Sequence, residues 1–227
     1  MISTMPIDAA PEHTVSRRKR PIMGITTVVL AAAVILLAST APAMAALPTP
    51  VDAATARSYL KALKVQDESN NPPYNRARFR HWITIAGQCD TRETVLKRDG
   101  TDVVTNEDCR AASGSWVSPY DDVSVTKATG LDIDHMVPLK EAWVSGASAW
   151  TAEERKQFAN DLVRPQLLAV TASTNRAKAD KDPAEWMPPL DAYHCTYARA
   201  WVEVKHHYKL SVDDAEQAKL TKILESC

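Results

Sequence analysis

Two adjacent residues have the clearest chemical potential: Asp134 and His135, in the stretch LDIDHMVPL at 131–139. A neutral imidazole is the usual group for removing a proton from water near pH 7. A carboxylate offers the oxygen ligands that a hard cation such as Mg²⁺ prefers, and Asn175 offers an amide oxygen further along the chain. A base, oxygen ligands and nearby lysines indicate metal-assisted hydrolysis of a phosphate ester.

Three short elements have to position these residues. Alternation in LDIDHMVPL predicts a half-buried strand that Pro138 ends, because proline cannot donate to the ladder. PQLLAVT at 165–171 predicts a second strand, and TASTNRAKADKD at 171–182 predicts a short helix. Neighbouring side chains point to opposite sides of an extended strand, so Asp134 and His135 serve one site only if the chain bends.

The rest of the chain alternates between helical and strand-prone patterns. Asp90 is a candidate N-cap, and Thr151 with Glu154 forms a capping box. An α+β fold is therefore predicted. The expected elements are helices within 55–65, 91–98, 152–160, 191–208 and 212–227, and two or three strands within 99–126, with an exposed loop at 67–79.

The first 45 residues resemble a secretory signal peptide. A basic stretch, RRKR at 17–20, precedes an apolar run that ends in Ala43-Met44-Ala45, the small-residue pattern of a cleavage site. Cleavage after Ala45 predicts a secreted, extracellular protein; the alternative is an uncleaved N-terminal membrane anchor. Loss of four basic and two acidic residues would change the formal net charge from −1 to −3, which argues against binding nucleic acid by bulk charge alone.

The cysteines indicate disulfides rather than a metal site. Their number is even and no C-x-x-C spacing occurs, so two disulfides are expected in an oxidising compartment. Three pairings are possible, and we favour the pairs that are neighbours in sequence. These pairs are Cys89 with Cys109 and Cys195 with Cys227.

Three blocks of the sequence resemble a known family. They are DIDHMVPLKEAW, FANDLVRPQLLAVTASTNRAKADKDPAEWMPP and CDTRETVLKRD. They are similar to the secreted branch of the HNH (His-Me finger) endonucleases, the DUF1524 type. The resemblance implies a ββα-metal core with flanking helices that cuts phosphodiester bonds of nucleic acid. It divides the mature chain into an N-terminal helix and linker at 46–74 and a nuclease domain at 75–227.

The resemblance also implies roles for individual residues. His135 matches the general base, and Asp134 and Asn175 match the ligands of one divalent metal, Mg²⁺ or Mn²⁺. Asn160 matches the residue that braces the loop around the base. Lys178 matches a lysine that neutralises a phosphate, and Ala179 stands where the family's NRxKG block has glycine.

Other basic residues are candidates for contact with nucleic acid. Arg176 and Lys181 lie beside Lys178, although all three could instead form a solvated helical face with neighbouring aspartates. Arg92 is a further candidate, with an ion pair to a nearby acid as its alternative reading.

The predicted function is a secreted, metal-dependent endonuclease. We expect DNA as the substrate with little sequence preference, RNA being open, and contact with a membrane only through an uncleaved N-terminal segment. No obligate protein partner is evident. The alternative is a catalytically inactive protein of the same fold that binds nucleic acid or a cell-surface partner.

Overall fold

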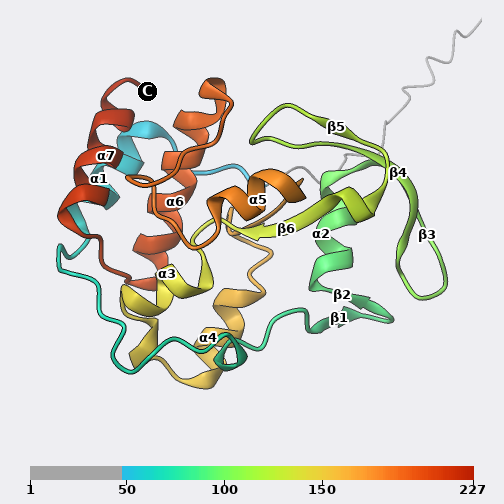
Figure 1. Cartoon of the computed structure of the whole chain (residues 1–227), viewed down its shortest axis with the longest axis horizontal. Coiled ribbons are helices and arrows are strands. Elements are labelled where there is room, and N and C mark those ends of the chain that lie inside the picture. Colours follow the sequence, from blue (N-terminus) through green and yellow to red (C-terminus); the bar gives the residue numbers. More distant parts are fainter. Residues whose placement is uncertain (1–47) are drawn as a thin grey trace, which may run out of the picture. The chain divides into compact units, whose positions relative to one another are not determined.

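The computed structural model describes residues 48–227, so the predicted signal peptide lies outside the described residues. Within them the fold is α+β, as expected from the sequence. None of the described helices is long and apolar enough to cross a membrane. Figure 1 shows the arrangement of the helices and strands.

A two-stranded antiparallel sheet carries part of the candidate site. Strand β6 (Leu131–His135) pairs antiparallel with β7 (Leu167–Thr171), from Leu131 opposite Thr171 to His135 opposite Leu167. Helix α5 (Ala172–Lys178) begins directly after β7 and packs on both strands (Figure 1). The predicted order of strand, strand and short helix is therefore present.

The long connection between β6 and β7 carries helices. Helix α3 (Leu139–Val144) begins after Pro138, and α4 (Ala152–Ala159) begins after Thr151. The predicted capping box is present, because the Thr151 hydroxyl accepts from the Glu154 amide while the Glu154 carboxylate accepts from the Thr151 amide. The sequence pattern did not predict α3, a single short helix.

Three helices form one side of the molecule. Helix α1 (Ala53–Ala62) packs against α6 (His194–Tyr208) and α7 (Asp214–Glu225), which also contact each other (Figure 1). A disulfide joins Cys195, near the start of α6, to Cys227. These helices bury large side chains such as Tyr197 and Trp201.

A smaller set of strands surrounds helix α2. Strands β3 (Thr101–Thr105), β4 (Ala111–Val117) and β5 (Ser124–Val125) form an antiparallel sheet, as expected for 99–126. Strands β1 (Thr84–Ala86) and β2 (Cys89–Asp90) form a hairpin that was not predicted. Helix α2 (Thr91–Asp99) follows β2.

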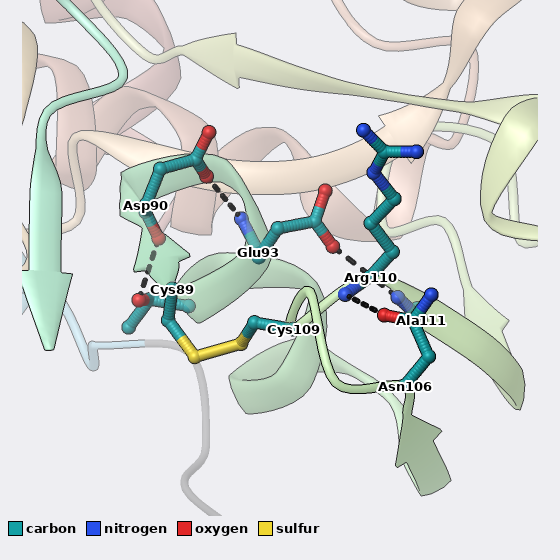
Figure 2. The surroundings of a disulfide bond; sticks show 8 residues. Cys89, Asp90, Glu93, Asn106, Cys109, Arg110 and Ala111 are labelled. Atoms are coloured by element: carbon teal, nitrogen blue, oxygen red, sulfur yellow. Dashed lines mark hydrogen bonds between the residues drawn. A yellow bond between two sulfur atoms is a disulfide. The ribbon is translucent and has the colours of Figure 1, made fainter. Parts of the chain in front are cut away.

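Figure 2 shows how these pieces are joined. The Cys89–Cys109 disulfide connects β2 to the turn between β3 and β4, so both expected cysteine pairs are confirmed. Asp90 is the N-cap of α2, with its carboxylate 2.8 Å from the Glu93 amide nitrogen. The Glu93 carboxylate accepts in turn from the Ala111 amide at 3.3 Å.

The β6–β7 sheet separates two apolar clusters. Leu131 and Ile133 of β6 pack with Leu167 and Ala169 of β7 against α2 and Trp116. The alternate residues of β7 face the larger cluster formed by the helices. Because side chains alternate along a strand, Asp132 and Asp134 share the face that α5 covers, while His135 belongs to the opposite face.

Candidate active site

A pocket of about 490 Å³ lies at the end of β6. Its walls come from the segment around Tyr74, from the chain that leaves β6, and from α5 with the turn after it. Four residues predicted for the site line it. Asp134 and His135 belong to β6, and Asn175 and Arg176 belong to α5. The lining residues are Tyr74, Arg76, Ile133, Asp134, His135, Pro138, Leu139, Lys140, Asn175, Arg176, Ala179 and Asp180.

The imidazole of His135 is held in one orientation. Its Nε2 lies 3.0 Å from the backbone carbonyl oxygen of Ala159, and its ring stacks on Trp82 with 5.6 Å between centroids. A carbonyl only accepts hydrogen bonds, so Nε2 carries the proton and Nδ1 of the neutral ring is free to accept one. Burial lowers the pKa of His135 to about 3, and the positive charge of Arg76 contributes. The ring is therefore a neutral base at physiological pH.

Asn160 connects the end of α4 to the segment before α2. Its side-chain oxygen accepts from the Thr91 hydroxyl at 2.7 Å and from the Ile83 amide at 3.2 Å. Its side-chain nitrogen donates to the carbonyls of Arg80 and Lys156, at 2.8 Å and 2.7 Å. These bonds fix the backbone next to Ala159, which holds His135. Asn160 thus contacts the chain around the base, and its side chain does not line the pocket.

Asp134 lines the pocket and belongs to a buried polar group. One carboxylate oxygen is 2.9 Å from Lys178 Nζ, and the other accepts from the Tyr120 hydroxyl at 2.5 Å. Burial raises the pKa of Asp134 and lowers the pKa of Lys178, while the attraction between the two charges opposes both changes. Both carboxylate oxygens are thus engaged by protein donors.

The position of Lys178 corrects the role expected from the sequence. Its side chain has no exposed surface, and its ammonium also donates to the His135 carbonyl oxygen at 2.7 Å. A fully buried ammonium cannot meet a phosphate of a bound substrate. Lys178 instead ties α5 to the end of β6, so it positions the residue that carries the base.

Asn175 meets Asp132 rather than Asp134. The Asn175 amide donates to one Asp132 carboxylate oxygen at 3.2 Å, and Arg176 Nε lies 3.8 Å from the same oxygen. No role was expected for Asp132. The sequence pattern could have indicated a role for Asp132, because side chains alternate along a strand and Asp132 therefore shares one face with Asp134.

The remaining predicted basic residues lie in different places. Arg176 lines the pocket, and its side chain is 78% exposed. Lys181 is exposed and donates to the Ala177 carbonyl at 2.9 Å. Arg92 pairs with Glu93 at 3.3 Å and donates to the Leu131 carbonyl at 3.2 Å, so it joins α2 to β6 outside the pocket lining. For Arg92 the structure has the ion pair that was its alternative reading.

One further feature of the pocket was not foreseen. Arg76 and Tyr74 reach it from a segment that was expected only to be an exposed loop. Ala179, where the resemblance led us to expect glycine, has a φ of 52°, in the left-handed region that favours glycine. Nothing in the local pattern of 67–79 indicates that this loop approaches His135.

An acidic group lies apart from this pocket. Carboxylate oxygens of Glu68, Asp182 and Asp213 lie within 4.8 Å of one another. None of the three lines the pocket that contains His135.

The protein therefore has an α+β fold and a pocket that the buried, neutral His135 lines. Three basic side chains line the same pocket: Arg76, Lys140 and Arg176. Residues 90–223 match the family described as the C-terminal domain of GmrSD restriction endonucleases. The match covers more than half of the chain, so the protein belongs to this family. Family membership indicates a nuclease-like function and a nucleic-acid substrate.

A related protein supports the prediction that this protein is secreted. A protein of Arthroderma benhamiae described as an uncharacterized secreted protein is 50% identical over 208 residues, which is 90% of this chain and 100% of the relative. With two disulfides, which persist in oxidising compartments, this indicates that the protein is secreted, as expected. No solved structure matches the chain.

Proposed function

We propose that the protein is a secreted, metal-dependent endonuclease of the HNH type, in which His135 is the general base. The observation that carries this proposal is the imidazole itself. It is neutral, its Nε2 is fixed by the Ala159 carbonyl, and it lines a pocket with several cationic side chains. A neutral imidazole whose Nδ1 is free can accept a proton from water in this pocket.

The reaction follows from these positions. His135 removes a proton from water through Nδ1, and the hydroxide attacks phosphorus from the side opposite the leaving oxygen. General-base catalysis of this type contributes about 10² to 10⁴ in rate. Lys178 and Asn160 hold the chain around the base. Arg176, exposed at the pocket, faces the anionic substrate.

The oxygen donors near Asn175 fit a divalent cation. Asn175 and Asp132 adjoin each other, and in the described part of the chain the second Asp132 oxygen has no hydrogen-bond donor. Asp134, expected as the carboxylate ligand, already neutralises Lys178. We therefore propose that Asp132 and Asn175 would hold Mg²⁺ or Mn²⁺. The cation would stabilise negative charge on the phosphate and on the leaving oxygen.

We further propose that the substrate is DNA cut with little sequence preference, with RNA as the alternative. The formal net charge would be −3 after cleavage behind Ala45, so affinity depends on a few local contacts. Contacts to phosphates carry no sequence information by themselves. Cutting should therefore weaken with added salt and vary little among sequences.

A plasmid nicking assay tests the function directly. Purified, disulfide-bonded wild type should nick DNA with Mg²⁺ or Mn²⁺ and stop in EDTA. His135→Ala should lower the rate by about 10² to 10⁴. His207→Ala is the matched control, because His207 is an exposed histidine outside the pocket lining.

The same assay separates the alternative. If folded wild type binds DNA or RNA but cuts neither with any of these metals, the protein is a binding module and the proposed catalysis is wrong.

A further inference from the structure

Arg76 occupies a fixed place on the wall of the pocket. It opens a short 3-10 helix (Arg76–Arg78), which Asn75 caps by accepting from the Ala77 amide at 2.9 Å. The flanking aromatic residues anchor this segment. Phe79 is 1% exposed and Tyr74 packs edge-on against Trp143. The backbone of Arg76 is therefore held by the core, whereas its side chain is exposed.

Arg76 is also the cation of the pocket whose charge is least compensated. Lys140 pairs with Asp180, and Arg176 lies 3.8 Å from Asp132. The Arg76 guanidinium contacts His81 Nε2 at 3.4 Å and forms no ion pair within 48–227. A guanidinium without a carboxylate partner keeps its donors for a ligand.

Arg76 and His135 line the same pocket. The positive charge of Arg76 is among the causes that lower the pKa of His135, so it acts across the pocket on the imidazole. An anion bound in the pocket would share the cavity that both Arg76 and His135 line. Arginine suits this task because its planar fork can bind two phosphate oxygens at once.

We propose that Arg76 binds the non-bridging oxygens of the phosphodiester that His135-activated water attacks. This inference rests on the proposed nuclease function and names the residue that recognises the reacting group. Arg76 takes the phosphate-neutralising role that the buried Lys178 cannot fill. It lies outside residues 90–223, which match the family, so the family match does not supply it.

The test compares Arg76→Gln, Arg76→Lys and Arg78→Gln in the full secreted protein. Arg78 belongs to the same 3-10 helix and is exposed, but it does not line the pocket. Two readouts are used: the nicking rate with Mg²⁺, and the fluorescence anisotropy of a labelled DNA duplex in EDTA over a range of salt. Thermal unfolding verifies that each variant is folded.

Loss of a charge-assisted phosphate contact predicts that Arg76→Gln lowers kcat/KM by about 10- to 100-fold. The slope of log affinity against log salt should decrease by about 0.9, because one phosphate contact disappears. Arg76→Lys should restore part of the rate and the whole slope. Arg78→Gln should stay within about twofold of wild type, as expected for an exposed charge outside the site.

Equal behaviour of Arg76→Gln and Arg78→Gln in both readouts would overturn the proposal. If wild type binds DNA without cutting it, the proposed function fails, yet a weaker affinity and smaller salt slope for Arg76→Gln alone would still support Arg76 as the phosphate-binding residue. A wild type that neither binds nor cuts overturns both proposals.

Discussion

At the scale of single residues, the two aspartates of β6 have different surroundings. Asp134 is 4% exposed and neutralises the buried Lys178, whereas Asp132 is partly exposed beside Asn175. The two carboxylates should therefore respond differently to the same substitution.

Asp132→Asn should weaken binding of Mn²⁺ with little effect on stability. Asp134→Asn should lower the free energy of unfolding by about 3 to 5 kcal/mol, because it leaves the Lys178 ammonium buried without its counter-charge. Calorimetric titration with Mn²⁺ and urea unfolding measure the two effects. If Asp134→Asn folds as wild type does and loses Mn²⁺ instead, Asp134 is the ligand, as first expected from the sequence.

The buried base also predicts how stability depends on pH. The pKa of His135 is lowered from 6.5 to about 3, so between these values the unfolded chain binds a proton that the folded protein does not. Stability from this group is complete above about pH 6.5 and decreases as pH falls toward 3, by up to about 1.4 kcal/mol per pH unit.

Urea unfolding of wild type and His135→Gln from about pH 4 to 7 measures this contribution. Glutamine can still donate to the Ala159 carbonyl but does not titrate, so the variant should show a flatter pH dependence. Parallel curves for the two proteins would mean that His135 is not held neutral in the folded state.

At the scale of elements, the contact between α5 and the end of β6 depends on Lys178. Lys178 donates to the Asp134 carboxylate and to the His135 carbonyl, and its ammonium lies 5.9 Å from the centre of the Trp201 ring. Lys178 thus connects the helix, the strand that carries the base, and the core of α6.

Lys178→Met should destabilise the protein by about 3 to 5 kcal/mol, because Asp134 would remain buried without a cation. Lys181→Met is the control, since Lys181 is exposed on the same part of the chain and should change stability by less than about 0.5 kcal/mol. Urea unfolding measures both. A stable Lys178→Met variant with weakened DNA binding would support the phosphate role instead.

At the scale of the whole molecule, the disulfides hold distant parts of the chain together. The Cys195–Cys227 bond closes a longer loop than Cys89–Cys109, with sequence separations of 32 and 20. It fixes the chain end beyond α7 to the start of α6.

Replacing Cys195 and Cys227 together by serine should lower the free energy of unfolding by about 2 to 4 kcal/mol, mainly because the unfolded chain gains freedom. Nicking activity at low temperature should remain, since neither cysteine lines the pocket. Thermal unfolding with and without reductant measures the loss. A double variant that is as stable as oxidised wild type would contradict this account.

Much of the secondary structure was predictable because its causes are local. Asp90 caps α2, Thr151 and Glu154 cap α4, and alternation marks β6, all within a few residues of one another. The β1–β2 hairpin and α3 were not predicted. They are short, and their stability comes from packing and from the Cys89 disulfide rather than from a repeated pattern.

The sequence by itself determined the α+β class and the Asp134-His135 pair at the end of a strand, and it favoured the cysteine pairing that the structure then confirmed. Only the tertiary structure decided that Lys178 is buried, that Asn175 meets Asp132, and that the loop bearing Arg76 reaches the pocket. The physical reason is the separation along the chain of the residues that interact. Caps and periodicity act between residues close in sequence, whereas burial and the approach of charged groups depend on contacts between segments far apart in the chain.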